Sequence, residues 1–187
     1  AGAVEDDWPL VYVNPVPTGL AFIRVDETGF SGAFSTEVSS GEIEKFLVDG
    51  DPESGPTSYV GKASGLNEAG TMRLALDQVL PWIGEKVIQP LLKFVGSEEP
   101  KGLSIVACGW LPLVPLHAAQ VNLGGKERRL LDVYPTRCSP SGAMLAASLN
   151  RPSSVSEKRF VAIANPDGSL PVTEAEVHAV AGAVGSG

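Results

Sequence analysis

The chain has 187 residues and a formal net charge of −8 at pH 7, and 43% of its residues are apolar. The apolar share is enough for a hydrophobic core, which excludes a chain that is disordered throughout, and the length suits one domain of ordinary size. The acidic balance argues against non-specific binding to nucleic acid, and the sequence has no run of about 18 apolar residues that would predict a transmembrane helix.

The two cysteines, Cys108 and Cys138, are too few for a disulfide framework. The start of the sequence has no basic region followed by an apolar stretch, so it does not indicate a signal peptide. These two features favour a cytoplasmic protein with reduced thiols. Because the sequence starts at Ala1 and stops at Gly187 just after a helical pattern, we expect it to be a piece of a longer protein.

The N-terminal part, residues 9–38, is predicted to be an antiparallel β-meander. Residues 9–13 and 19–25 are two strand-like runs, and a Pro-rich turn lies between them. A second turn precedes a third predicted strand over residues 30–38. This part of the chain should therefore form its own β-layer.

Two helical regions are expected next. The first is a short helix over residues 41–48, with Ser39 or Ser40 as its N-cap. The second is a helical segment over residues 66–95, in which apolar residues recur every three or four positions. Pro81 should end or kink the first helix of this segment.

From residue 101 to 187 the pattern changes to short strands that alternate with helices. The predicted strands are residues 103–108, 130–134 and 160–164, and the predicted helices are residues 139–149 and 173–184. Such alternation is typical of a parallel or mixed sheet with helices on its faces. The fold class expected for the whole chain is therefore α/β.

The candidate nucleophiles and bases are two cysteines and two histidines. Cys108 ends an apolar strand, which favours an inert, buried thiol. Cys138 precedes a predicted helix, and because a helix N-terminus lowers the pKa of a thiol, it is the better reactive candidate of the two. An inert cysteine is the favoured interpretation here too, since one favourable feature is weak evidence. His117 lies among apolar residues, which favours a structural role, and His178 is expected to be solvated on the last helix. These residues do not form a convincing complete active site.

Metal and cofactor sites are not predicted. The cysteines and histidines lack the close spacing of zinc ligands. Gly124-Gly125-Lys126 is followed by Glu127 where a phosphate-binding loop needs Ser or Thr. We therefore assign no metal ligand and no cofactor.

Several segments, taken in order, resemble the CHAT domain, a caspase-like module often found beside tetratricopeptide repeats. They are Leu-Val-Tyr-Val at 10–13, Gln-Pro-Leu-Leu at 89–92, Leu-Ser-Ile-Val at 103–106, Gly-Trp-Leu-Pro-Leu-Val-Pro-Leu-His at 109–117, Leu-Leu-Asp-Val-Tyr at 130–134, Phe-Val-Ala-Ile-Ala-Asn-Pro at 160–166 and Glu-Ala-Glu-Val at 174–177. Each motif alone is weak, but their shared order is specific. One departure is Ala107-Cys108, where the family usually has Pro and a small polar residue.

The resemblance implies a caspase-like sheet and a cysteine peptidase that cleaves proteins or peptides. In this family the catalytic His and then the catalytic Cys follow the Glu-Ala-Glu-Val helix, so both would lie beyond the end of this chain. We therefore assign no catalytic residue here. The implied partners are the missing C-terminal catalytic portion and a tetratricopeptide-repeat domain, which is often found beside this module. Neither nucleic acid nor a membrane is expected as a partner. The alternative is a caspase-like interaction module without chemistry.

The resemblance also points to one substrate-binding loop. Asn165 and Asp167 follow the predicted strand over residues 160–164, and in caspase-like folds this loop lies near the pocket for a substrate side chain. Asp167 would then attract a basic side chain. The alternative interpretation is a plain Pro-Asp-Gly turn, since that triplet strongly favours turns.

Overall fold

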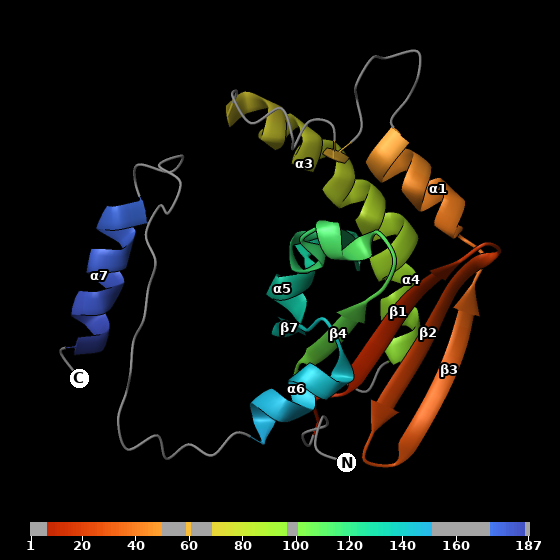
Figure 1. Cartoon of the computed structure of the whole chain (residues 1–187). Helices are drawn as coiled ribbons and strands as arrows, with labels where there is room; N and C mark the ends of the chain where they lie inside the picture. The colour runs from red at the N-terminus through yellow and green to blue at the C-terminus, as the bar shows by residue number, and fades with distance from the viewer. Residues whose placement is uncertain (1–6, 50–58, 61–68, 97–100, 151–172, 186–187) are drawn as a thin grey trace. The chain divides into compact units, whose positions relative to one another are not determined.

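A computed structural model describes residues 7–49, 59–60, 69–96, 101–150 and 173–185 (Figure 1). The contacts divide the chain into two units, Ala1–Asn150 and Arg151–Gly187, and each is described here by itself. In the described ranges, no helix has the length and apolar character needed to span a membrane.

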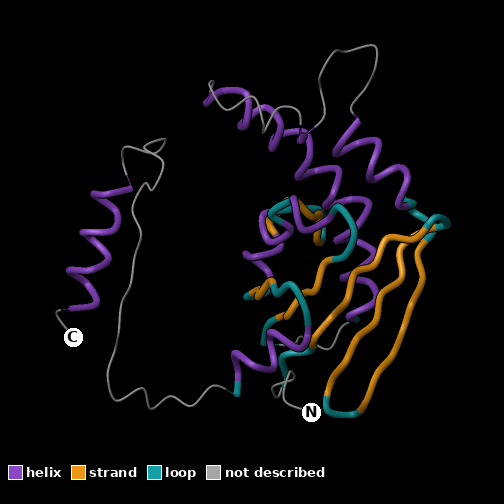
Figure 2. Tube along the Cα trace, in the orientation of Figure 1, coloured by secondary structure: helices purple, strands orange, loops and turns teal. Residues whose placement is uncertain are grey.

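The first unit is built on a five-stranded mixed sheet with the strand order β3-β2-β1-β4-β7 (Figures 1 and 2). Its strands are β1 (Leu10–Val16), β2 (Gly19–Asp26), β3 (Gly29–Ser35), β4 (Leu103–Ala107) and β7 (Thr136–Cys138). The pairs β1–β2 and β2–β3 are antiparallel, whereas β1–β4 and β4–β7 are parallel. This arrangement confirms the predicted α/β class with an N-terminal meander.

Strand β1 is longer than predicted, because it continues through Pro15 to Val16 before a two-residue turn. Pro15 has no N–H to donate, which normally excludes it from a central strand. Here Pro15 lies beyond Val13, the last residue of β1 that pairs with β4, and in the register with β2 it faces Leu20. The strand therefore continues past the point where it has two neighbours, where a missing N–H is tolerated.

The predicted short helix is present as α1 (Ser40–Glu44), followed by the π-helical turn η1 (Lys45–Asp49). Ser39 is its N-cap, and the amide of Glu42 donates to the Ser39 hydroxyl at 3.3 Å. In return, the amide of Ser39 donates to the Glu42 carboxylate at 2.8 Å. This reciprocal capping box fixes the start of the helix directly after the meander.

The predicted helical segment consists of α3 (Ala69–Ile83), the π-helical turn η2 (Gly84–Ile88) and α4 (Gln89–Val95). Pro81 lies inside α3 instead of ending it. Pro90 lies in the first turn of α4, where a missing N–H costs little. The three pieces follow one another without a loop, and buried residues from all three join the main core.

Residues 130–134 were predicted to form a strand, and this prediction was wrong. They form α5 (Leu130–Val133), which the carboxylate of Asp132 caps by accepting a hydrogen bond from the Arg129 amide at 3.1 Å. Leu130 is fully buried while Leu131 is half exposed. The helix thus buries one side of the apolar run and exposes the other. The N-terminal cap favours the helix more than the β-propensity of these residues favours a strand.

The remaining elements of the first unit are short. They are the 3₁₀ turns η3 (Leu111–Leu113) and η4 (Leu116–Ala118), the antiparallel ribbon of β5 (Gln120–Leu123) and β6 (Lys126–Arg129), and helix α6 (Gly142–Leu149). The ribbon was not predicted, because four of its residues are the charged run Lys-Glu-Arg-Arg.

Two apolar clusters hold the sheet between its helices. The larger one joins residues of β1, β2 and β4 to the helical segment and includes Phe22, Ile83, Val87, Leu91 and Ile105. The smaller one, on the other sheet face, consists of Leu10, Val106 and Leu145 of α6. The sheet is therefore covered on both faces near β4, which explains why β4 reads as a continuous apolar run.

The second unit contains helix α7 (Thr173–Gly185), which confirms the helix predicted from the Thr-Glu-Ala-Glu pattern. The predicted strand over residues 160–164 lies outside the described residues, as do Asn165 and Asp167.

Candidate functional site

The carboxyl ends of β4 and β7 bring the two cysteines to the same end of the sheet. The strands are parallel, and Cys138, the last residue of β7, pairs with Ile105 of β4. Cys108 follows directly after β4, three residues further along. In open α/β sheets this is the end at which ligands bind, so it is the natural place to look for chemistry in this unit.

Cys108 is held in place by its backbone and is half buried. Its amide donates to the Val13 carbonyl at 3.0 Å, and its own carbonyl accepts from the Leu111 amide at 3.3 Å. The side chain packs against the cluster that contains Leu10 and Leu145. Burial raises the pKa of the Cys108 thiol. Less thiolate is present at neutral pH than for a free cysteine, which fits the expected inert role.

Cys138 is exposed, as expected for a turn between a strand and a helix. However, the predicted lowering of its pKa by the helix N-terminus was wrong, because desolvation raises the pKa of this thiol. Although the residue is exposed overall, the sheet end still removes enough water from the sulfur to disfavour its charged form. Cys138 is therefore not an activated nucleophile in this structure.

The position of the helix start explains this correction. The helix was predicted to begin at residue 139, but α6 begins at Gly142 with Ser141 as its N-cap, and the Ser141 hydroxyl accepts from the Met144 amide at 3.2 Å. Ser139 instead continues the pairing with β4, since its amide donates to the Ile105 carbonyl at 3.0 Å. Cys138 thus lies three residues before the cap, and the field of a helix end falls off within its first turn.

The two histidines lie in different units of the chain. His117 on η4 is exposed, whereas its apolar neighbours in the sequence predicted an apolar environment. The 3₁₀ turn buries Leu116 and directs His117 to solvent. His178, exposed as predicted, belongs to α7 in the second unit. For both described thiols, desolvation is the cause of the pKa shift, with no opposing effect of an imidazole.

A metal centre is also not found in the part of the chain that the structure describes. There, no three side chains of His, Cys, Asp or Glu come together in a group that could hold a metal ion.

One feature of this end of the sheet was not predicted. Trp110 and Leu113, in the segment that leaves β4, have 40% and 46% of their surface exposed. Gly109 starts this segment with a φ of 61°, which few other residues adopt readily, and so turns the chain sharply away from β4. Most residues around them are apolar, and residue type alone does not distinguish the buried members of this segment from the exposed ones.

One protein family matches the larger part of this chain. The family model of the CHAT domain matches residues 77–187, from within α3 to the end of the chain. Because this match covers more than half of the sequence, the chain belongs to the CHAT domain family. The comparison confirms the resemblance noted in the sequence for the segments within residues 77–187, whereas the segment at 10–13 lies outside the match. A comparison with curated proteins gave no match.

Proposed function

We propose that this chain is the scaffold part of a CHAT-type cysteine peptidase whose catalytic His and Cys lie outside it. The observation that carries the proposal is the CHAT family match together with two described thiols whose pKa values are raised. A peptidase of this class needs a thiolate beside an imidazole, with the imidazole as general base. Neither Cys108 nor Cys138 offers that combination.

In this proposal the chain contributes the meander, the helical segment and the first part of the sheet. The catalytic portion of the same domain would be its main partner, and a tetratricopeptide-repeat domain a second one. The substrate would be a protein or peptide, cleaved in the cytoplasm. The raised pKa values of the two thiols support only one part of this proposal, namely that the nucleophile is a residue other than Cys108 or Cys138.

The substrate-binding role of Asn165 and Asp167 belongs to the same proposal. Asp167 would attract a basic side chain of the substrate through its carboxylate, and Asn165 would shape the loop before it. The support is the family match, which includes both residues. Asp167→Asn should then reduce cleavage after basic residues more than after neutral ones.

The alternative is an interaction module of caspase-like fold without chemistry. The exposed Trp110 and Leu113 favour it, because large apolar side chains grouped on a surface often mark a binding site. Both proposals predict a docked partner, and only the first predicts turnover.

Labelling of the longer protein with an irreversible, peptide-based thiol reagent tests the proposal. Peptide mapping by mass spectrometry should place the label on a cysteine outside residues 1–187, and unlabelled competing peptide should prevent the reaction. Label on Cys108 or Cys138 that the peptide competes for would contradict it. Absence of any such labelling in the folded protein would favour the interaction module.

A further inference from the structure

Strand β3 forms one edge of the five-stranded sheet, and its outer side is open among the described residues (Figures 1 and 2). Its sequence is Gly-Phe-Ser-Gly-Ala-Phe-Ser, with no charge and no proline. Natural edge strands usually carry lysine, proline or a bulge, which prevent pairing with other chains. None of the seven residues of strand β3 is a lysine or a proline.

The register of the meander identifies the backbone groups on the open side. Asp26 pairs with Gly29 across a two-residue turn, so Gly29, Ser31, Ala33 and Ser35 direct their N–H and C=O groups toward β2. The backbone groups of the alternate residues, Phe30, Gly32 and Phe34, therefore point away from the sheet. These three residues are the hydrogen-bonding positions that a further strand would use.

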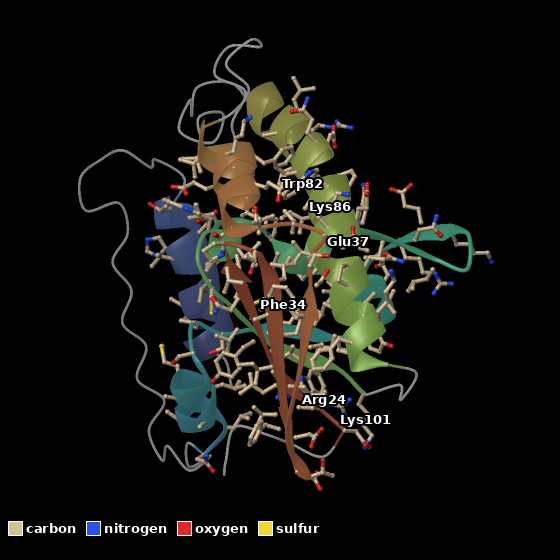
Figure 3. The ribbon with its side chains drawn as sticks, turned by 90° about the vertical axis from the view of Figure 1, so that its right-hand side faces the viewer. Arg24, Phe34, Glu37, Trp82, Lys86 and Lys101 are labelled. Carbon is tan, nitrogen blue, oxygen red and sulfur yellow. The ribbon has the colours of Figure 1, made fainter. Side chains whose placement is uncertain are left out.

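The side chains of the same residues lie on the sheet face that is opposite the main core. Phe30 and Phe34 are 86% and 53% exposed, and Ile23 beside them on β2 is 44% exposed. The ring of Phe34 lies over the backbone of Gly19, which leaves no room for a side chain there. Figure 3 looks toward this edge of the molecule, with Phe34 on β3 and Glu37 beyond the end of the strand.

We propose that a second copy of this chain pairs with β3 in antiparallel orientation, with Gly32 opposite Gly32. The strand is self-complementary about this residue, since Phe30 and Phe34 each lie two positions from it. In this register Phe30 of each copy faces Phe34 of the other, and all three outward-facing residues meet as hydrogen-bonded pairs. An interface that maps onto itself in this way is what a two-fold dimer requires.

The pairs on the two faces fit this register. Two Phe–Phe pairs meet on the outer face, where cross-strand aromatic pairs are among the stabilising combinations. Ser31 faces Ala33 on the other side, so two small residues meet and neither is charged. The two sheets would continue as one, and Phe30 would lose much of its exposed surface.

The ends of the strands limit the strength of this dimer. Each end of the paired strands has an acidic residue nearby, Glu27 in the turn before β3 and Glu37 beyond its last residue. Each copy also has a net charge of −8. Association should therefore be weak at low ionic strength and become stronger with added salt, which screens the repulsion. A peptide with basic flanks would lack this repulsion, and its binding is an outcome of the test.

Sedimentation velocity of the full chain from about 5 to about 500 µM, a range that covers weak affinities, tests the proposal. The wild-type chain should show a monomer–dimer equilibrium that shifts toward dimer with salt.

Gly32→Lys brings two like charges together at the symmetry axis and should weaken association at least about tenfold. Its matched control is Ala147→Lys, which adds the same charge to the exposed side of α6 and should leave association within about twofold of wild type.

A disulfide trap fixes the register. Directly paired residues have Cα atoms about 5.5 Å apart, within disulfide range, so Gly32→Cys should form a covalent dimer under mild oxidation. A Cβ at residue 32 has only one neighbour, the Phe22 carbonyl oxygen at 3.4 Å, so the variant should fold. Thr28→Cys, at the end of the strand, should not exceed the wild-type background from the native thiols. A monomer at every concentration, or binding of a basic-flanked peptide without self-association, would overturn the proposal; neither result bears on the peptidase proposal.

Discussion

Gly84 of η2 lies directly against the backbone of Gln120 in β5, so that a Cβ on residue 84 would overlap the Gln120 carbonyl oxygen. A second contact lies close by, since the side-chain amide of Gln89, the first residue of α4, donates to the Asn122 carbonyl of β5 at 2.8 Å. The π-helical turn and the ribbon thus meet backbone to backbone. This close approach fixes the ribbon of β5 and β6 against the helical segment. Because α5 follows β6 directly, the position of its first residue is fixed as well.

Gly84→Ala should therefore destabilise the fold strongly. The new methyl group meets backbone, which can move only if η2 or β5 shifts, and we expect a loss of about 2–4 kcal/mol in the free energy of unfolding. Urea unfolding followed by circular dichroism measures it. The control is Gly41→Ala in α1, where a Cβ has no neighbour within 4 Å and alanine should leave stability unchanged or raise it slightly. Equal stability of both variants would contradict the described contact.

Ser39→Ala removes the N-cap of α1 and should lower the free energy of unfolding by about 1 kcal/mol near neutral pH. The effect should depend on pH, because the hydrogen bonds from the Ser39 hydroxyl and then its amide lower the pKa of Glu42. Because the pKa of Glu42 is lower in the folded state than in the unfolded state, its ionised carboxylate stabilises the fold at pH values above the unfolded pKa of Glu. This stabilisation is lost as the pH falls through the folded pKa. The difference between wild type and Ser39→Ala should thus shrink in acid. A difference that stays constant down to about pH 3 would argue against the capping box.

The two thiols should react at different rates with a small alkylating reagent. Cys138 is exposed and Cys108 is half buried, so Cys138 should react faster in the native chain. Because desolvation raises the pKa of both thiols, both rate–pH profiles should lie at higher pH than that of a free cysteine. In denaturant the two rates should become similar. A profile for Cys138 shifted to lower pH would restore it as a reactive candidate.

The meander and its first helix could be predicted because their signals are local. Alternating apolar residues with short turns define β1 to β3, and Ser39 with Glu42 three positions later defines the start of α1. The same holds for the last helix, α7, which begins at Thr173. In each case a few neighbouring residues contain the information.

The predictions that failed depended on contacts between distant residues and on local turns and caps that the apolar pattern did not reveal. The Leu130 run was expected to be a strand, yet its cap from Asp132 and the burial of Leu130 in the main core made it a helix. Cys138 was expected next to a helix start, yet pairing of the following Ser139 with β4 moved that start to Gly142. The exposure of His117 likewise follows from the direction of one 3₁₀ turn.

The measurement that tests the central claim most directly is peptide turnover by the longer protein carrying Cys108→Ser and Cys138→Ser together. The account predicts that the double variant keeps wild-type kcat/KM within about twofold, because neither thiol is the nucleophile, and that residues 1–187 alone show no turnover. A folded Cys138→Ser variant that loses activity by about 100-fold or more would contradict it, and would place the catalytic thiol at the end of β7.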